Sequence, residues 1–147
     1  MEKTNESSKE DTLLVWFNGM EIESIRHAIF NYLDRDEFTN NYNKDEAIKL
    51  EEIELDKIEQ LFNHKRENFE SYDSLEINLT LHQIYKIIKV ITIEEEKEKK
   101  ENKHYDDYEY PKNKKNYEQY SYKFFYIKEL GKLKEKFDFI LKRVKKN

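Results

Sequence analysis

The chain has 147 residues, of which 37% are hydrophobic and 40% are charged, and its formal net charge at pH 7 is −5. It contains no cysteine, two glycines and one proline. The lack of cysteine excludes disulfides, thiol nucleophiles and zinc fingers, and two glycines are too few for a glycine-rich phosphate loop. Because sandwiches and barrels need many Gly- and Pro-containing turns, the composition favours few, long elements in one domain.

The first 11 residues, MEKTNESSKED, are polar. We expect a disordered tail over residues 1–11, followed by a single domain over residues 12–147. The tail lacks the apolar run of a signal peptide, and no apolar run in the chain approaches the roughly 20 residues that cross a bilayer. We therefore expect a cytoplasmic protein that does not act at a membrane.

The first apolar segment, residues 13–17, is either a short buried strand or the first turns of a helix. From Glu21 onward the spacing of apolar residues is helical, and acidic residues in the first turn suit the helix dipole. The residues of this expected helical face are Ile22, Ile25, Ile29 and Leu33.

A polar linker over residues 34–46 precedes a second periodic stretch. The alternation of Ile53, Glu54 and Leu55 lets a strand over residues 50–55 compete with one long helix. In the strand alternative, Asp56 is the N-cap of the helix that follows. The apolar positions of the stretch are Ala47, Leu50, Ile58, Leu61 and Phe62.

Residues 75–79 alternate as a half-buried strand does, and Thr80 then has the position of a helix N-cap. The helix that it opens would carry Leu81, Ile84, Ile87, Ile88 and Ile91 on one face. After Ile93 the chain becomes highly charged, and we expect a charged loop around residues 94–116, either a solvated helix extension or disordered.

The last segment has the clearest pattern, because apolar residues recur at spacings of three and four over about seven turns, from about residue 117 to 145. Lys134 interrupts the stripe, and Leu133 and Ile140 widen it. We expect this helix to fold back on the helix from Thr80 as a hairpin. The stripe consists of Tyr117, Tyr120, Phe124, Ile127, Leu130, Phe137, Leu141 and Val144.

These elements predict a mainly α fold with a helical hairpin over residues 80–147. A small N-terminal sheet from residues 13–17, 50–55 and 75–79 would make the fold α+β. The apolar end of the last helix could also find its cover in a second subunit, which predicts a homodimer.

Charge is distributed unevenly along the chain. Residues 1–80 carry 20 acidic and 9 basic side chains, whereas residues 81–147 carry 12 acidic and 18 basic ones. The acidic half, residues 12–79, could pack against the basic helix of its own chain or of a second subunit. It could instead imitate nucleic acid and block a basic protein surface. Alternatively, basic residues could bind phosphates, and the candidates are Lys123, Lys142, Arg143, Lys145 and Lys146.

Seven of the eleven tyrosines lie between residues 105 and 126, interleaved with lysines. Tyrosine combines a large contact area with a polar tip, which suits protein interfaces, and aromatic residues among cations also suit stacking on single-stranded bases. The predicted partner-binding residues are those that fit the helical stripe least well and the lysines beside them: Tyr105, Tyr108, Tyr110, Tyr122, Lys112, Lys114 and Lys115.

No residue set indicates catalysis, a cofactor or a metal. The histidines, His27, His64, His82 and His104, form no HExxH motif, and the many carboxylates are expected to be solvated. Asp34 and Asp36 begin a calcium-loop pattern, but Thr39 stands where that loop needs glycine. We therefore expect a protein that is not an enzyme.

The leading functional hypothesis is a non-enzymatic protein-binding module. The abundance of Lys, Asn, Ile, Tyr and Phe indicates an AT-rich genome and favours a phage- or mobile-element-encoded regulator or inhibitor of a host protein. The alternative is a nucleic-acid-binding accessory protein that uses the basic, tyrosine-rich C-terminal segment. An enzyme would need carboxylates and histidines to converge in space.

Overall fold

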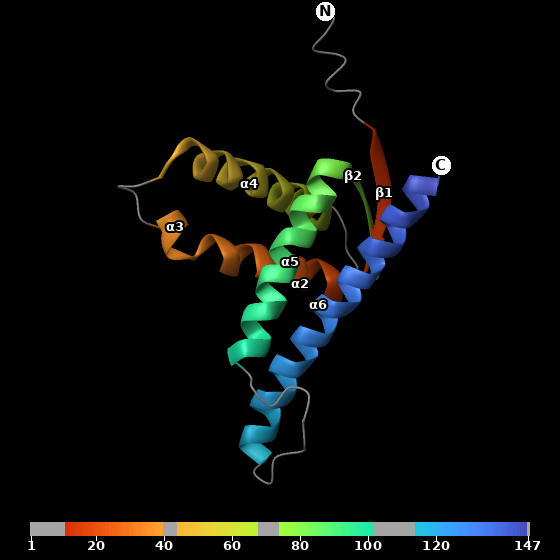
Figure 1. Ribbon diagram of the computed structural model, residues 1–147. Coiled ribbons are helices and arrows are strands. Elements are labelled where there is room, and N and C mark those ends of the chain that lie inside the picture. The colour runs from red at the N-terminus through yellow and green to blue at the C-terminus, as the bar shows by residue number, and fades with distance from the viewer. Residues whose placement is uncertain (1–10, 40–43, 68–73, 102–113, 147) are drawn as a thin grey trace, which may run out of the picture.

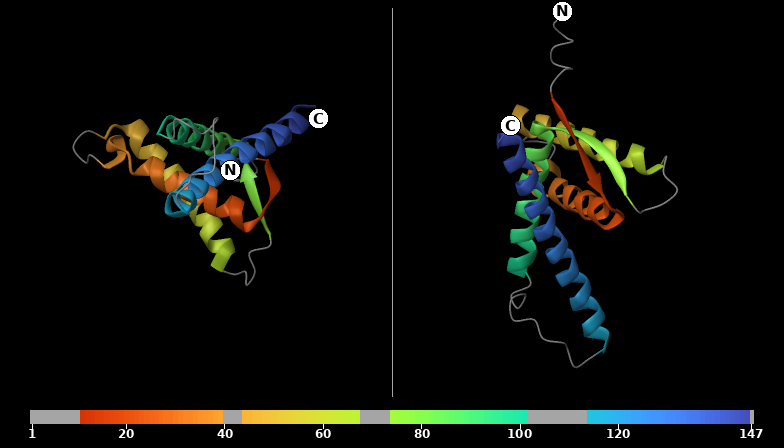
Figure 2. Two further views of the ribbon diagram at one scale, coloured as in Figure 1. Left: turned by 90° about the horizontal axis from the view of Figure 1, so that it is seen from below. Right: turned by 90° about the vertical axis from the view of Figure 1, so that its right-hand side faces the viewer.

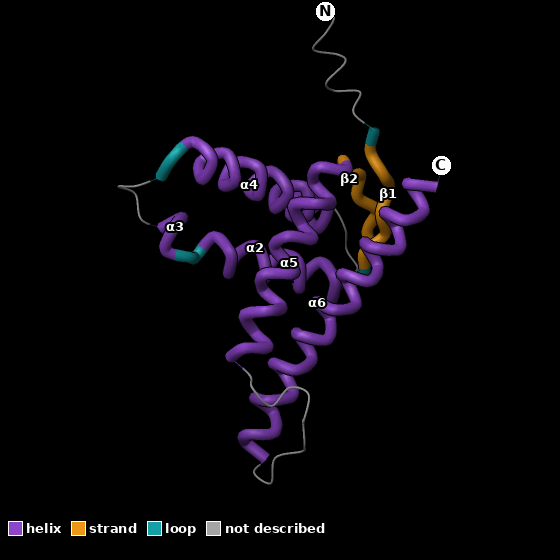
Figure 3. Tube along the Cα trace, viewed as in Figure 1, coloured by secondary structure: helices purple, strands orange, loops and turns teal. Residues whose placement is uncertain are grey.

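The computed structural model describes residues 11–39, 44–67, 74–101 and 114–146, and the statements below concern these residues. Helices make up most of the trace (Figures 1 and 3). The predicted mainly α fold with a small sheet is therefore confirmed. The elements are β1 (Thr12–Phe17), α2 (Gly19–Leu33), α3 (Asp36–Thr39), α4 (Glu46–Glu67), β2 (Leu75–Thr80), α5 (Leu81–Glu101) and α6 (Lys114–Lys146).

The sheet consists of β1 paired antiparallel with β2, with Thr12 opposite Thr80 and Phe17 opposite Leu75. Successive side chains alternate between the faces of a strand. One face is therefore buried, and it carries Val15, Phe17, Leu75, Ile77 and Leu79. The strands predicted at residues 13–17 and 75–79 are confirmed.

The strand predicted at residues 50–55 is wrong, because this segment lies inside α4. The alternation covered only three residues, whereas the buried positions Leu55, Ile58 and Phe62 repeat at helical spacing. Leu50 and Ile53 are more than half exposed.

Two details of the α4 prediction also change. Ala47 is exposed, and Asp56 lies in the helix interior rather than at an N-cap. The cap is Asp45, whose Oδ1 accepts the backbone N–H of Ile48 at 2.9 Å.

Capping boxes begin the helices that follow the two strands. At α2, Asn18 Oδ1 accepts the N–H of Glu21 at 2.8 Å, and Glu21 Oε1 accepts the N–H of Asn18 at 2.9 Å. At α5, Thr80 and Gln83 exchange the same two bonds at 3.0 Å each. The predicted cap at Thr80 is confirmed.

The predicted hairpin is formed by α5 and α6, which lie side by side (Figures 1 and 2). In both figures the end of α5 and the beginning of α6 project away from α2 and α4. Of the two alternatives for the charged segment, residues 94–101 take the helix extension, because they continue α5, and residues 114–116 belong to α6. The rest of that segment lies outside the described residues, and so do residues 1–10 of the tail predicted over residues 1–11.

The apolar stripe of α6 is covered within the chain from Ile127 to Leu141. The ring centroid of Phe17 lies 5.3 Å from that of Phe62 and 5.9 Å from that of Phe137, so β1, α4 and α6 meet in one core. Ile127, Leu130, Leu133 and Leu141 are also buried, and Ile140 and Val144 are partly buried. The homodimer expected from an uncovered stripe gains no support from these residues and stays a prediction.

Candidate functional site

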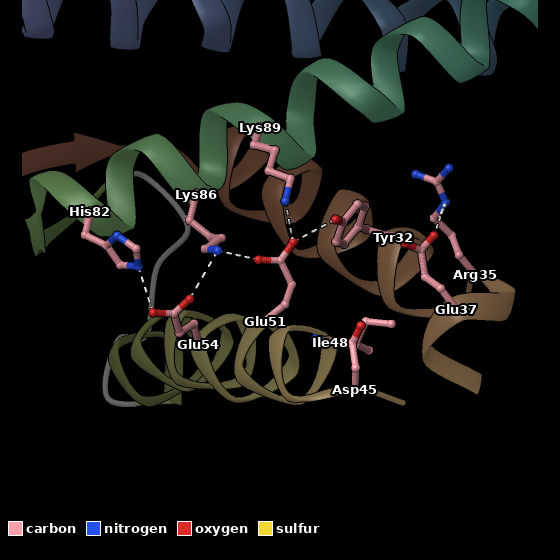
Figure 4. A network of polar contacts seen from close by, with 10 residues as sticks. All are labelled: Tyr32, Arg35, Glu37, Asp45, Ile48, Glu51, Glu54, His82, Lys86 and Lys89. Carbon is pink, nitrogen blue, oxygen red and sulfur yellow. Dashed lines mark hydrogen bonds and ion pairs between the residues drawn. The ribbon is translucent and has the colours of Figure 1, made fainter. Parts of the chain in front are cut away.

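An open cleft of about 370 Å³ lies where α2, α3, α4 and α5 meet. Figure 4 shows its polar residues, which come from the stretch that runs from α2 to α4 and from α5, more than 30 residues further along the chain. The cleft is lined by Tyr32, Glu37, Phe38, Asp45, Ala47, Ile48, Leu50, Glu51, Glu54, Lys86 and Lys89.

Glu51 is the centre of this network. Its side chain is buried on α4, and one carboxylate oxygen accepts a bond from Lys86 Nζ. The other oxygen accepts from Lys89 Nζ at 2.6 Å and from the Tyr32 hydroxyl at 2.7 Å. The carboxylate therefore ties α2 and α4 to α5, and every donor is supplied by the chain itself.

Three groups of the network, Glu51, Tyr32 and Lys86, have shifted pKa values. Burial raises the pKa of Glu51, but the bonds from Lys86, Lys89 and Tyr32 outweigh it and lower the pKa to about 2. Burial, followed by the bond to Glu51, raises the pKa of Tyr32. Although burial opposes it, the carboxylates of Glu51 and Glu54 raise the pKa of Lys86.

These shifts move the pKa values of Glu51, Tyr32 and Lys86 further from neutral pH. None of the three side chains is therefore poised as a general acid or base. Nearer the solvent, Lys86 Nζ also lies 3.1 Å from Glu54, and His82 Nε2 lies 2.7 Å from the other oxygen of Glu54. His82 is exposed and does not line the cleft. The network thus acts as a structural tie between helices.

A second group of carboxylates is buried between α2, α5 and α6. Glu94 is 2% exposed and accepts bonds from Asn31 Nδ2 at 2.5 Å and from the Tyr126 hydroxyl at 2.9 Å. Burial and the charge of Glu94 raise the pKa of Tyr126. The exposed His27 ring and the Tyr126 ring also form a T-shaped pair, with 5.0 Å between their centroids.

Glu95 explains the interruption of the α6 stripe by Lys134, because Lys134 Nζ donates to Glu95 Oε1 at 2.8 Å. Gly131 makes room beside it, since a Cβ there would lie 3.2 Å from Glu95 Oε2. The expectation that carboxylates are solvated is wrong for those that are buried: Glu51, Glu94, Glu95, Glu98 and Glu129.

Metal binding finds no support in the part of the chain that is described. Within those ranges, no three histidine or carboxylate side chains are grouped so that they could hold a metal ion.

Most of the predicted binding residues cannot be placed. Tyr105, Tyr108, Tyr110 and Lys112 lie outside the described residues. Helix α6 includes Lys114, Lys115, Tyr122, Lys123, Lys145 and Lys146, but their side chains are not described.

Lys142 and Arg143 are the members of these sets whose side chains are described, and both are exposed near the end of α6. Lys142 pairs with Asp138 of the same helix at 3.1 Å. The guanidinium of Arg143 lies 5.8 Å from the ring centroid of Phe139.

The predicted packing of the acidic half against the basic helix is only partly present. Lys134 and Lys136 of α6 pair with Glu95 of α5 and Glu21 of α2. The buried carboxylate of α4, Glu51, pairs with lysines of α5. Exposed cations of α6 such as Lys142 and Arg143 point to solvent and remain accessible to another molecule.

The sequence interpretation missed an exposed apolar surface on β1. Leu14 and Trp16 are 53% and 56% exposed and lie on the face of the sheet that points away from the core, which we call the outer face of β1. Met20 at the start of α2 and Phe139 on α6 are also exposed, at 49% and 61%. The alternation along residues 12–17 could have identified Leu14 and Trp16, because a strand that buries Val15 and Phe17 must expose the residues between them.

Comparison with protein-family models found no match, and neither did comparison with curated proteins or with solved structures. Among the described helices, none combines the length and the apolar character that crossing a membrane requires.

Proposed function

We propose that this protein is a non-enzymatic protein-binding module that contacts its partner through the outer face of β1. The observation that carries the proposal is the exposure of Leu14 and Trp16 by more than half on adjacent outward positions of one strand. Tryptophan is enriched among the residues that dominate binding energy in protein interfaces. The apolar side chains of Met20 and Phe139, on the neighbouring α2 and α6, are also exposed.

The polar cleft supports a non-enzymatic role, because its Glu51, Tyr32 and Lys86 side chains are not poised as general acids or bases. The Glu51 carboxylate is already paired with two lysines within the chain, and its pKa of about 2 keeps it ionised near neutral pH. The composition suggests an AT-rich source. We extend the proposal to a cytoplasmic regulator or inhibitor of a host protein, encoded by a phage or mobile element.

The test is affinity capture from host lysate with the wild type and two matched variants. Leu14→Ser combined with Trp16→Ser should lose the captured partner, because it removes the apolar contact area without touching the core. Leu50→Ser is the control, since Leu50 is 55% exposed but lies on α4. If the double variant captures the same partner as the wild type at equal yield, the outer face of β1 is not the binding surface.

A second candidate is nucleic-acid binding by α6. It is favoured by exposed cations along the described part of this helix, which are Lys128, Lys132, Lys142 and Arg143. Binding to single-stranded or duplex nucleic acid should weaken steeply with salt and should fall when Lys142→Glu and Arg143→Glu are combined.

The control for this candidate is Lys49→Glu with Lys57→Glu, which changes the net charge equally but on α4, where both lysines are exposed. An equal loss of binding in both double variants would indicate a nonspecific charge effect. Absence of any mobility shift at low salt would remove the candidate.

A further inference from the structure

One edge of β1 has no neighbouring strand within the described part of the chain, because the sheet contains β1 and β2 alone. The carbonyl of Trp16 accepts a bond from Lys136 Nζ of α6, and we infer from this donor that the carbonyl faces the open side. Backbone groups of every second residue in a strand point to the same side. The N–H and C=O of Leu14, and those of Thr12, therefore also point to the open side.

The sequence of β1, TLLVWF, contains no charged residue, no glycine and no proline. Every other described element carries at least one charge, including Glu76 on β2. Uncharged segments of about six residues with high β-propensity tend to pair with copies of themselves when an edge is open. The outward positions of β1 are also self-complementary, because antiparallel pairing centred on Leu14 places Thr12 opposite Trp16 and brings no like charges together.

Lys136 occupies this edge. Besides the Trp16 carbonyl, its ammonium contacts Glu21 Oε1 at 2.9 Å and lies 4.7 Å from the ring centroid of Phe17. Glu21 is itself held by the capping box with Asn18. The ammonium is therefore fixed at the position that an incoming strand would need, because that strand would have to donate a backbone N–H to the same carbonyl.

We propose that the open edge of β1 is a pairing site for β1 of a second copy of this chain, and that Lys136 holds this site closed. Lysine on an exposed edge is a recurrent means of preventing edge-to-edge association. The inference is independent of the proposed partner binding, because it concerns the backbone edge rather than the outer face, and its test measures self-association alone.

The decisive variant is Lys136→Met, which removes the donor and the charge but keeps an unbranched side chain. Sedimentation velocity should give a dimer dissociation constant at least about tenfold lower than that of the wild type. Lys132→Met is the matched control, because Lys132 is an exposed lysine of the same helix whose ion pair, with Glu129, stays within α6. This control should leave the constant unchanged.

Two further variants separate pairing at the edge from a general loss of charge. Glu21→Gln keeps the capping acceptor but removes the ion pair to Lys136. It should therefore also lower the dimer dissociation constant, by a smaller factor than Lys136→Met does. Adding Leu14→Lys to Lys136→Met should restore the wild-type constant, because two lysines would then face each other across the symmetric pair. Circular dichroism checks that each variant is folded.

The location of the contact can be tested directly, since the chain contains no cysteine. Across an antiparallel pair, directly opposed Cα atoms lie about 4.5–5.5 Å apart, within disulfide range. Leu14→Cys in the Lys136→Met background should therefore give disulfide-linked dimers under oxidation. Unchanged association of folded Lys136→Met and Glu21→Gln would overturn the proposal, and so would a tighter dimer that does not cross-link at position 14.

Discussion

Glu51 shows how a buried charge is stabilised in this chain. Its two oxygens receive three donors from two other helices, which offsets the cost of removing the carboxylate from water. Breaking such a network leaves the largely buried Tyr32 hydroxyl and Lys86 ammonium without their acceptor, and that usually costs more than the intact network contributes.

We expect Glu51→Gln to lower the free energy of unfolding by about 2 kcal/mol, because a neutral amide is a weaker acceptor for two ammonium groups. Urea denaturation measures the change. The neighbouring Glu52→Gln is the control, since Glu52 has one ion pair, to Lys44 at 2.9 Å, and is more exposed. It should cost less than about 1 kcal/mol, and equal effects of the two variants would contradict the role assigned to Glu51.

The low pKa of Glu51 makes this contribution dependent on pH. Since the folded pKa is about 2 and the ordinary value is 4.5, the stabilisation is complete above the ordinary value and is lost as pH falls toward 2. The difference in unfolding free energy between wild type and Glu51→Gln should therefore stay constant above about pH 5 and narrow below it. A difference that stays constant down to pH 3 in urea titrations would count against this explanation.

At the scale of elements, periodicity predicted most helices and both strands, because their burial follows from the spacing of apolar residues along one segment. The strand expected at residues 50–55 was wrong because three alternating residues also occur on a helix, where Leu55 is buried and Ile53 is exposed. The buried carboxylates were missed because Glu94 and Glu95 are stabilised by Tyr126 and Lys134, more than 30 residues away.

The surface of β1 that we propose for binding was predictable only in part. The outer face of β1 follows from the alternation of Leu14 and Trp16 once the strand is accepted. Lys136 at the edge of β1 depends on how α6 packs beside the sheet, which no local pattern encodes. The tyrosines proposed for partner binding stay a prediction, because Tyr105, Tyr108 and Tyr110 lie outside the described residues.

Gly131 and Glu95 provide a test of packing between α5 and α6. Gly131→Ala gains about 1 kcal/mol in helix propensity, but the new Cβ would lie 3.2 Å from Glu95 Oε2 and would force that carboxylate to move. We expect a net stabilisation below about 0.5 kcal/mol in the wild type and the full gain in a Glu95→Ala background. A double-mutant cycle by urea denaturation measures this coupling, and equal effects in both backgrounds would show that Glu95 does not limit the substitution.

At the scale of the whole molecule, Phe17 joins the two halves of the chain, because its ring contacts Phe62 of α4 and Phe137 of α6. The apolar core extends from Val15 on β1 to Leu141 on α6. This arrangement favours one cooperative unit, although the expected single domain over residues 12–147 stays a prediction.

Thermal or urea unfolding, followed by two probes, can test whether the chain unfolds as one cooperative unit. Trp16 is the single tryptophan, so its fluorescence reports on β1, while far-UV circular dichroism reports on the helices. The two transitions should coincide. Phe17→Ala should lower the unfolding free energy by about 3–5 kcal/mol and shift both probes equally, and separate midpoints would indicate two folding units.

The contact between Trp16 and Lys136 also has a consequence for biosynthesis, because the two residues are 120 positions apart in the chain. A ribosome that adds about 5–20 residues per second needs about 6–24 s to translate that interval. During this time β1 has left the ribosome before the lysine that occupies its edge has been made. The β1 strands of nascent chains on one polysome can therefore pair with each other most readily in this interval, before Lys136 has been made.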